Sequence, residues 1–134
     1  LSLSLSLRIR FYNTQTGQLL NEIDTGSQVS GLVWSRGEEK ELVSSHGFSK
    51  NELCVWSYPS LVKVAELTGH CGRVLHLCLS TDGSTVCSAA ADESLRFWRV
   101  WDGAERRKAR LANSAVAAAT KADTGRGGLA LRLR

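Results

Sequence analysis

The sequence predicts an all-β protein built from propeller blades, and two regularities support this. A bulky aromatic residue recurs inside a short apolar run at Tyr12, Trp56 and Trp98, with spacings of 44 and 42 residues. Two matching dipeptides, Gln28-Val29 and Arg73-Val74, open the two later units. A repeat of this length is typical of WD-repeat units, each of which forms a four-stranded blade. We therefore expect two to three blades from one end of a larger ring.

Short strand-like runs bounded by turn residues follow one another between residues 7 and 102. No such run follows Trp98 to complete the last unit, so we expect its outer strand to come from elsewhere. Unpaired sheet edges should make the isolated chain a poor stable monomer. The expected strands are Leu7–Tyr12, Leu19–Ile23, Val29–Trp34, Leu42–Ser45, Leu53–Trp56, Val62–Leu67, Val74–Leu79, Thr85–Ala89 and Leu95–Val100.

The chain divides into a start at residues 1–6, a partial propeller at 7–102 and a basic tail at 103–134. The Leu-Ser alternation of the start fits half an edge strand or low-complexity sequence, and we favour the second. Because the sequence starts with Leu and contains no Met, we expect it to be part of a longer protein. The expected blades are a half blade at 7–26, a blade at 27–68 and the last blade at 69–102.

Basic residues are concentrated in the tail. Residues 103–134 hold eight Arg and Lys against two acids, whereas residues 1–102 hold nine against eleven. The Ala-rich stretch Glu105–Ala122 fits a helix, which Gly125–Gly128 would end. A basic tail can bind nucleic acid, but it is more often a solvated segment or a protein-docking arm. We therefore favour a protein partner over nucleic acid.

Composition argues against several classes of protein. Hydrophobic residues make up 43% of the chain, enough for a packed core, but no run of about 18 apolar residues predicts a transmembrane helix. The start lacks a basic leader, so we expect no secretory signal. Four Cys without a paired spacing predict a reducing compartment and no disulfide framework. Three of them, Cys54, Cys78 and Cys87, lie in strand-like runs, where we expect small buried thiols.

A set of polar residues in the last unit, His70, Ser88, Asp92 and Trp98, predicts a structural network. A buried imidazole between an acid, a hydroxyl and an indole N–H would satisfy all of these groups across the strands. The set superficially resembles a hydrolytic triad, but nothing around Ser88 forms a nucleophile elbow. We therefore predict a structural role.

The preceding unit departs from this pattern. Ser27 stands where a His would, and Lys50-Asn51 replaces the turn Asp. We therefore expect that unit to be held by packing around Trp34 and Trp56 instead of by a polar network.

Neither a metal, a cofactor nor a catalytic site is indicated by the remaining residues. His46, His70, His76 and the cysteines lack the short ligand spacings of a zinc site. Gly125–Gly128 lacks the strand before and the Lys-Ser/Thr after that a phosphate-binding loop needs. The acids around Glu41 crowd one polar turn and form no catalytic pair. We predict that the protein is not an enzyme.

Three polar residues occupy positions from which a propeller can bind a partner. Gln28 and Arg73 come immediately before the first strand of successive units, a position beside the central channel on one face. An amide and a guanidinium there suit an acidic or polar peptide. Glu93 follows Asp92, where its side chain can point toward a cation. From the residues alone, ordinary solvated loop residues are the favoured interpretation of all three.

Four segments resemble the fizzy, or cell division cycle protein 20, family. Its members are WD-repeat activators and substrate receptors of the anaphase-promoting complex, a ubiquitin ligase. The match runs from about Leu7 to Asp102 and includes details outside the repeat, among them the His-Gly loop and the Tyr-Pro turn. It implies the end of a seven-bladed propeller and a location in nucleus and cytoplasm. The segments are Asp24–Val29, His46–Asn51, Trp56–Ser60 and Ala91–Trp98.

The resemblance implies roles for individual residues. Gln28 and Arg73 match positions that contact the Lys-Glu-Asn degron on the propeller top. Glu93 matches an acidic position that pairs with the Arg of the destruction-box degron, between the last and first blades. The final Leu133-Arg134 is similar to the family's terminal Ile-Arg, which docks on a helical-repeat subunit of the ligase, with Leu in place of Ile.

The leading hypothesis is an adaptor that brings degron-bearing substrates to the anaphase-promoting complex and activates it. Its partners would be subunits of that complex and degron peptides of substrates or inhibitors, with no membrane and no cofactor. A generic WD-repeat scaffold that has lost ligase docking is the alternative, and a nucleic-acid-associated protein is the third. Some features resemble the mitotic family member and others the fizzy-related member, so the member stays open.

Overall fold

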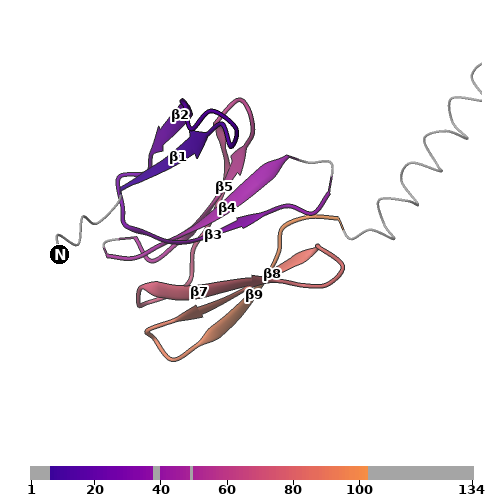
Figure 1. Ribbon diagram of the computed structural model, residues 1–134. Coiled ribbons are helices and arrows are strands. Elements are labelled where there is room, and N and C mark those ends of the chain that lie inside the picture. Colours follow the sequence, from indigo (N-terminus) through magenta and orange to yellow (C-terminus); the bar gives the residue numbers. More distant parts are fainter. Residues whose placement is uncertain (1–6, 38–39, 49, 103–134) are drawn as a thin grey trace, which may run out of the picture.

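The computed structural model describes residues 7–37, 40–48 and 50–102. Every regular element in these ranges is a β-strand, and the strands form three antiparallel sheets arranged one beside the other (Figure 1). In this part of the chain, no helix is long and apolar enough to cross a membrane. The predictions for the start at 1–6, the helix at 105–122 and the docking pair Leu133-Arg134 lie outside the described residues.

The three sheets take their strands in sequence order, with no crossover. All nine expected strands are confirmed, with ends that differ from the prediction by at most one residue. The division into blades and domains stays a prediction. The first sheet pairs β1 (Arg8–Tyr12) with β2 (Leu19–Asp24); the second runs β3 (Val29–Trp34), β4 (Glu41–His46), β5 (Leu53–Ser57), β6 (Lys63–Leu67); the third runs β7 (Val74–Leu79), β8 (Thr85–Ala90), β9 (Leu95–Arg99).

One difference at a strand end matters for the site. The sequence places His46 in a loop, whereas it is the last residue of β4 and pairs with Val29 on β3. Side chains alternate between the two faces of a strand, so Ser44 and His46 point to the same side. His46 is therefore a buried residue of the second sheet, with only 1% of its surface exposed.

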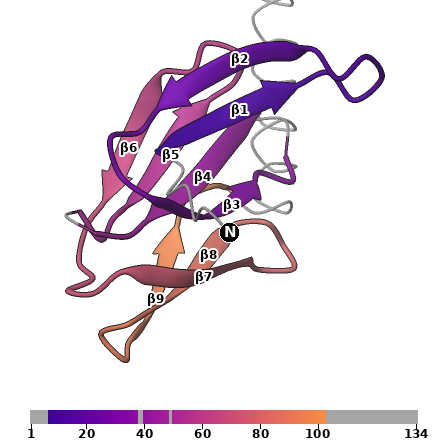
Figure 2. The ribbon, with the colours of Figure 1, turned by 60° about the vertical axis from the view of Figure 1, so that its left-hand side comes forward.

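Two apolar clusters hold the sheets together. Strand β7 packs against β3 and β4, so the third sheet lies beside these two strands of the second sheet (Figure 2). Trp101, which was not among the predicted core residues, adds a link to the second sheet: its indole N–H donates to Glu41 Oε2 on β4 at 2.7 Å. The buried members of the larger cluster are Val43, Leu53, Val55, Val74, Val86, Ala90 and Trp101; the smaller one, under the first sheet, holds Ile9, Ile23, Leu42, Cys54 and Trp56.

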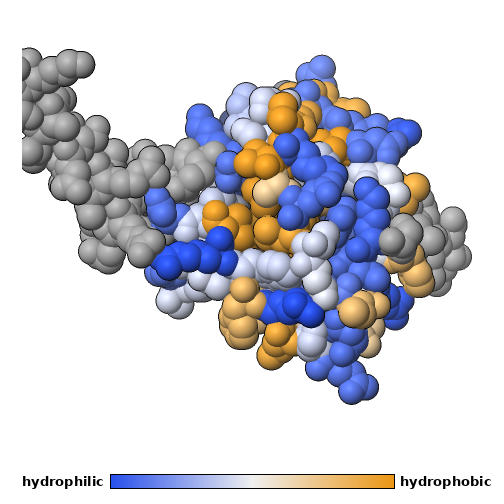
Figure 3. Space-filling view, turned by 180° about the vertical axis from the view of Figure 1, so that it is seen from behind, coloured by the Kyte–Doolittle hydropathy of each residue, from blue (hydrophilic) through white to orange (hydrophobic). Residues whose placement is uncertain are grey.

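The outer face of the third sheet is apolar and uncovered by any described residue. Leu95 and Phe97 are 64% and 70% exposed, and Phe97 lies opposite Cys87, which in turn pairs with Cys78 on β7. Hydrophobic side chains also reach the surface between hydrophilic ones in the space-filling view (Figure 3). Cys54 is buried as expected, but Cys87 is only partly buried and Cys78 is exposed, because this face lacks a covering layer in the described part. The expectation of buried thiols was wrong for Cys78.

Candidate functional site

The three connections that carry Gln28, Arg73 and Glu93 lie at one end of the sheets, together with the connection between β4 and β5. Gln28 comes directly before β3, and residues 47–52 join β4 to β5. Arg73 comes directly before β7, and residues 91–94 join β8 to β9. Because successive strands are antiparallel, every second connection falls on the same edge. We call this end the loop edge; it consists of Gln28, residues 47–52, Arg73 and residues 91–94.

In the third sheet, the structure brings His70, Ser88, Asp92 and Trp98 into one hydrogen-bonded chain. The Trp98 indole N–H donates to Ser88 Oγ at 2.8 Å, and Ser88 Oγ lies 2.8 Å from His70 Nε2. His70 Nδ1 lies 3.0 Å from Asp92 Oδ2. Because the indole only donates and the carboxylate only accepts, the Ser88 hydroxyl must donate to Nε2 and the protonated Nδ1 to Asp92. The chain is fully satisfied.

Asp92 also fixes the turn that carries Glu93. Ser94 Oγ donates to Asp92 Oδ1 at 2.6 Å, and the Cys71 backbone N–H donates to Oδ2 at 2.8 Å. These bonds, the one from Ser94 foremost, hold the pKa of the Asp92 carboxyl well below its usual range. Glu93 sits at the tip of the turn with a left-handed backbone (φ 61°) and an exposed side chain. The network thus presents Glu93 to solvent on the loop edge.

The second sheet contains a related network, which the sequence analysis missed. The Trp56 indole N–H donates to Ser44 Oγ at 2.8 Å, and Ser44 Oγ lies 2.8 Å from His46 Nε2. The prediction that packing replaces a polar network in this unit was therefore wrong. The predicted packing itself is present, because Trp56 is buried in the smaller apolar cluster and the Trp34 ring contacts two other aromatic rings. Trp34 is about half exposed, and Trp56 is held by a polar network as Trp98 is. A Ser-x-His sequence in a strand, followed by a Trp in the next strand, was the available signal.

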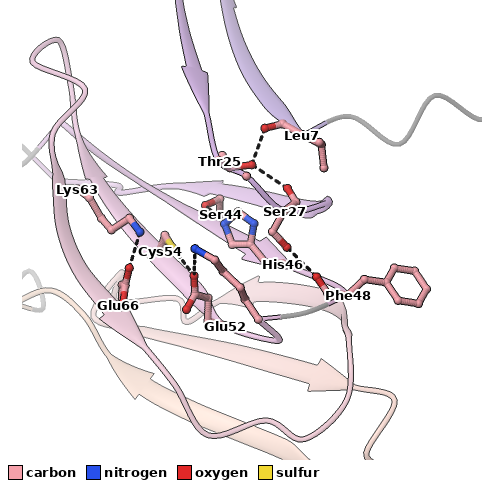
Figure 4. Close-up of polar contacts among 12 residues, drawn as sticks. Leu7, Thr25, Ser27, Ser44, His46, Phe48, Glu52, Cys54, Lys63 and Glu66 are labelled. Atoms are coloured by element: carbon pink, nitrogen blue, oxygen red, sulfur yellow. Dashed lines mark hydrogen bonds and ion pairs between the residues drawn. The ribbon is translucent and has the colours of Figure 1, made fainter.

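His46 lacks the acid that His70 has. Among the described side chains, its Nδ1 is the one buried nitrogen or oxygen with no hydrogen-bond partner (Figure 4). The Ser27 carbonyl acts on the ring electrostatically but makes no hydrogen bond of normal geometry with Nδ1. Burial lowers the pKa of His46, because the charged imidazolium is poorly solvated there. We conclude that His46 is a neutral structural residue.

Gln28 and Arg73 meet at the loop that follows His46. A Cβ built on Gly47 would lie 3.4 Å from Gln28 Oε1 and 3.3 Å from Arg73 Cβ, so both side chains pack on this glycine. The Gly47 backbone N–H donates to the Gln28 carbonyl at 3.0 Å. Next along the loop, the exposed ring of Phe48 lies under the Arg73 guanidinium, with 5.6 Å between Cζ and the ring centroid. The sequence analysis did not single out Gly47 or Phe48.

The Ser88 network does not have the geometry of a nucleophile. Ser88 is completely buried, and its hydroxyl oxygen accepts from Trp98 while its proton is directed at His70. A catalytic serine needs access to a substrate carbonyl and donors for the oxyanion. In this part of the chain, the His–Ser–Asp set is therefore a structural element.

One group of potential metal ligands occurs among the described residues. Single ligand atoms of Glu52, Cys54 and Glu66 lie within 4.8 Å of one another. Lys50 and Lys63 neutralise the two carboxylates, the first at 3.6 Å from Glu52 and the second hydrogen-bonded to Glu66. Burial raises the pKa of the Cys54 thiol to about 12, so the thiolate that a metal needs is disfavoured. The group is better described as an ion-paired cluster beside β5.

Comparison with known proteins connects this architecture to a family. The model of the WD domain, G-beta repeat, matches residues 61–102. The chain is 61% identical over 93 residues to Cell division cycle 20.1, cofactor of APC complex, of Arabidopsis thaliana, covering 69% of this chain and 20% of that protein. It is 63% identical over 94 residues to the Anaphase-promoting complex subunit cdc20 of Dictyostelium discoideum, covering 70% of this chain and 19% of that protein.

A second branch of relatives and a solved structure agree. The chain is 56% identical over 93 residues to the Anaphase-promoting complex subunit cdh1 of Dictyostelium discoideum, covering 69% of this chain and 12% of that protein. A chain of the Crystal Structure of Mitotic Checkpoint Complex matches with a TM-score of 0.70 and 46% identity, over 74% of this chain and 32% of that chain. The fold is thus that of a WD-repeat propeller. The chain spans about a fifth of the length of the first two relatives.

Proposed function

We propose that these repeats, which are homologous to the WD-repeat region of the Cdc20, cdh1 and fizzy-related proteins, belong to a substrate-recognition adaptor and activator of the anaphase-promoting complex. The observation that carries the proposal is the loop edge, where the half-buried Gln28 and the exposed Arg73 pack on the same glycine, Gly47. The names of these relatives describe cofactors or subunits of that complex. The adaptor would itself perform no catalysis.

The chemistry of the loop edge suits two kinds of degron. The Arg73 guanidinium can pair with the Glu of a Lys-Glu-Asn peptide, and the Gln28 amide can both donate to and accept from the neighbouring Asn. The Glu93 carboxylate can pair with the Arg of a destruction-box peptide. Neither Arg73 nor Glu93 has an ion-pair partner among the described residues. Each charge is therefore available to a ligand.

The proposal also covers docking and location. Leu133-Arg134 would dock on a helical-repeat subunit of the ligase, as the similar terminal Ile-Arg of the family does, and the protein would act in nucleus and cytoplasm. Deleting these two residues from the complete protein should weaken its binding to the purified complex while leaving degron peptides bound as before. Unchanged binding to the complex would favour the generic WD-repeat scaffold.

Peptide titrations on the complete protein test the recognition sites. Arg73→Ala combined with Gln28→Ala should weaken a Lys-Glu-Asn peptide and spare a destruction-box peptide, and Glu93→Lys should do the reverse. A charge-assisted hydrogen bond contributes about 1.5–3 kcal/mol, so the expected loss is about tenfold to hundredfold. Arg99→Ala is the matched control, because Arg99 is exposed at the opposite end of β9. Wild-type protein that binds neither peptide would overturn the proposal.

A further inference from the structure

The loop between β4 and β5 is built so that Phe48 reaches the surface while its neighbours stay inside. Phe48 is 59% exposed, whereas His46 and Gly47 directly before it are buried. Figure 4 shows the Phe48 ring extending away from the sheet and from the buried imidazole. A single exposed ring is common on protein surfaces, so what distinguishes Phe48 is its contact with Arg73.

The backbone that leads to the ring is held by buried hydrogen bonds. The Ser27 hydroxyl, 2% exposed, donates to the Gly47 carbonyl at 2.7 Å and lies 3.2 Å from the Phe48 carbonyl. The His46 backbone N–H donates to the Glu52 carbonyl at 2.9 Å, which closes the loop. Ser27 in place of a WD-type His therefore serves to hold this loop. The ring is presented from a rigid base.

The Arg73 guanidinium rests on this ring. Its Cζ lies 5.6 Å from the Phe48 centroid, within the range of a cation–π contact. The Arg73 carbonyl accepts from the Ala91 backbone N–H at 2.9 Å, so the backbone of Arg73 is also fixed. Within the described ranges no carboxylate pairs with this guanidinium. The ring thus orients a cation that has kept its capacity to bind an acid.

We propose that Phe48 is a positioning residue that holds the Arg73 guanidinium ready for an acidic side chain of the bound peptide. This rests on the proposed function, because it concerns the same loop edge. A long Arg side chain loses rotamer freedom when it binds, and a ring that already restricts it reduces that loss. The ring acts through Arg73, so its effect should be specific for the acidic residue of the ligand.

The test uses the complete protein and two peptides, one with Lys-Glu-Asn and one with Lys-Gln-Asn in the same flanking sequence. Phe48→Ala should weaken the Glu peptide about twofold to fivefold, the range of a solvent-exposed cation–π contact, and leave the Gln peptide unchanged. Phe48→Tyr should restore the affinity for the Glu peptide, since its ring can carry the same contact. Thermal unfolding should be unchanged, because the ring is mostly exposed.

A double-mutant cycle separates positioning from direct contact. In an Arg73→Gln background, Phe48→Ala should cause no further loss of affinity. Equal losses for both peptides, or a loss that persists in the Arg73→Gln background, would overturn the inference. So would wild-type affinity of Phe48→Ala for the Glu peptide. If the wild-type protein does not bind the Glu peptide at all, the proposed Lys-Glu-Asn recognition fails and the inference fails with it; the other outcomes leave that recognition intact.

Discussion

The second and third sheets hold the same Trp–Ser–His chain but draw the imidazole from different parts of the backbone. In the third sheet His70 stands before β7 and reaches Ser88 on the neighbouring strand β8. In the second sheet His46 lies on the same strand as Ser44, two residues further along. The distances from the Ser oxygen to the ring and to the indole are 2.8 Å in both sheets. The hydrogen-bond distances are thus the same in the two sheets, although the His residue comes from a different position in each.

The difference between the two sheets is the acid. Asp92 completes the chain in the third sheet and fixes the Glu93 turn. In the second sheet His46 Nδ1 has no partner among the described residues, and the residues at the corresponding turn are Lys50-Asn51. The turn of the third sheet is therefore fixed by a side chain. The loop of the second sheet is fixed by Ser27 and carries Phe48 to the loop edge. The second sheet thus has Ser27 and Lys50-Asn51 where the third has His70 and Asp92, and its loop places an exposed ring beside Arg73.

The largest expected effect tests whether the serine has the same role in both sheets. Ser44→Ala and Ser88→Ala each remove the acceptor of a Trp indole and the donor to a His ring. Each buried group left unsatisfied costs about 1–3 kcal/mol, so both variants should strongly lower the opening free energy of their own sheet. Amide hydrogen exchange on the complete protein measures this sheet by sheet. Ser60→Ala, in an exposed turn, is the control. A variant with unchanged exchange would remove that serine from its network.

A smaller and unequal effect should come from replacing the two rings by leucine. His70→Leu removes a donor to Asp92 and an acceptor for Ser88, and should lower the opening free energy of the third sheet by about 1–3 kcal/mol. His46→Leu also strands a hydroxyl, that of Ser44, but it removes the unsatisfied Nδ1 at the same time. The net change in the second sheet should therefore stay within about 1 kcal/mol. Equal losses in both sheets would show that Nδ1 is satisfied in solution.

As the pH falls, the opening free energy of the second sheet should decrease at a higher pH than that of the Asp92 turn. Burial lowers the pKa of His46, so as the pH falls below about 6.5 the unfolded segment takes up a proton that the folded ring resists. The opening free energy of the second sheet should then fall with pH by at most about 1.4 kcal/mol per unit, less the contribution of Glu52, which raises the pKa of the ring.

The Asp92 turn should respond at a lower pH. Its carboxyl has a lowered pKa, so its contribution is fully present above the unfolded value of about 3.9 and is lost only below that value, as the pH falls through the lower pKa of the folded state. Hydrogen exchange at several pH values distinguishes the two ranges. The His46→Leu variant should lose the dependence of the second sheet that begins below about pH 6.5. A dependence that survives this change would belong to another group.

The strands could be predicted from the sequence because each is a short apolar run between turn residues, and the repeat fixes their order. The third-sheet network could be predicted for a similar reason, since His70, Ser88, Asp92 and Trp98 fall at the expected positions of the unit. The second-sheet network could not be predicted by aligning the units, because Ser27 occupies the position of the His. Only the strand register, which extends β4 to residue 46, places His46 on the same face as Ser44.

The contacts of Gly47 and Phe48 were also outside the reach of the sequence. A repeat pattern identifies Gln28 and Arg73 as equivalent residues of successive units, but it does not say which loop lies between them. That depends on how β7 packs against β3 and β4, which is a contact between sheets. The small side chain needed at residue 47 and the ring at residue 48 become meaningful only when that packing is known.

The smallest expected effect concerns this spacing. Gly47→Ala would place a methyl group 3.3 Å from Arg73 Cβ, which would have to move by a few tenths of an ångström, and 3.4 Å from Gln28 Oε1, an ordinary van der Waals contact. Both neighbours are side-chain atoms near the surface, and stability should change by no more than about 0.5 kcal/mol. Gly72 offers no such gentle change, since a Cβ there would lie 2.7 Å from the Asp92 backbone nitrogen.

The readout for Gly47→Ala is peptide affinity. If Gln28 and Arg73 act together on one ligand, separating them should weaken a Lys-Glu-Asn peptide about twofold to fivefold, equivalent to about 0.4–1 kcal/mol. A destruction-box peptide, expected at Glu93 on the turn of the third sheet, serves as the internal control and should bind as before. Equal weakening of both peptides would mean that the change spreads through the loop edge as a whole. Unchanged binding of both peptides would mean that affinity does not depend on the spacing of Gln28 and Arg73.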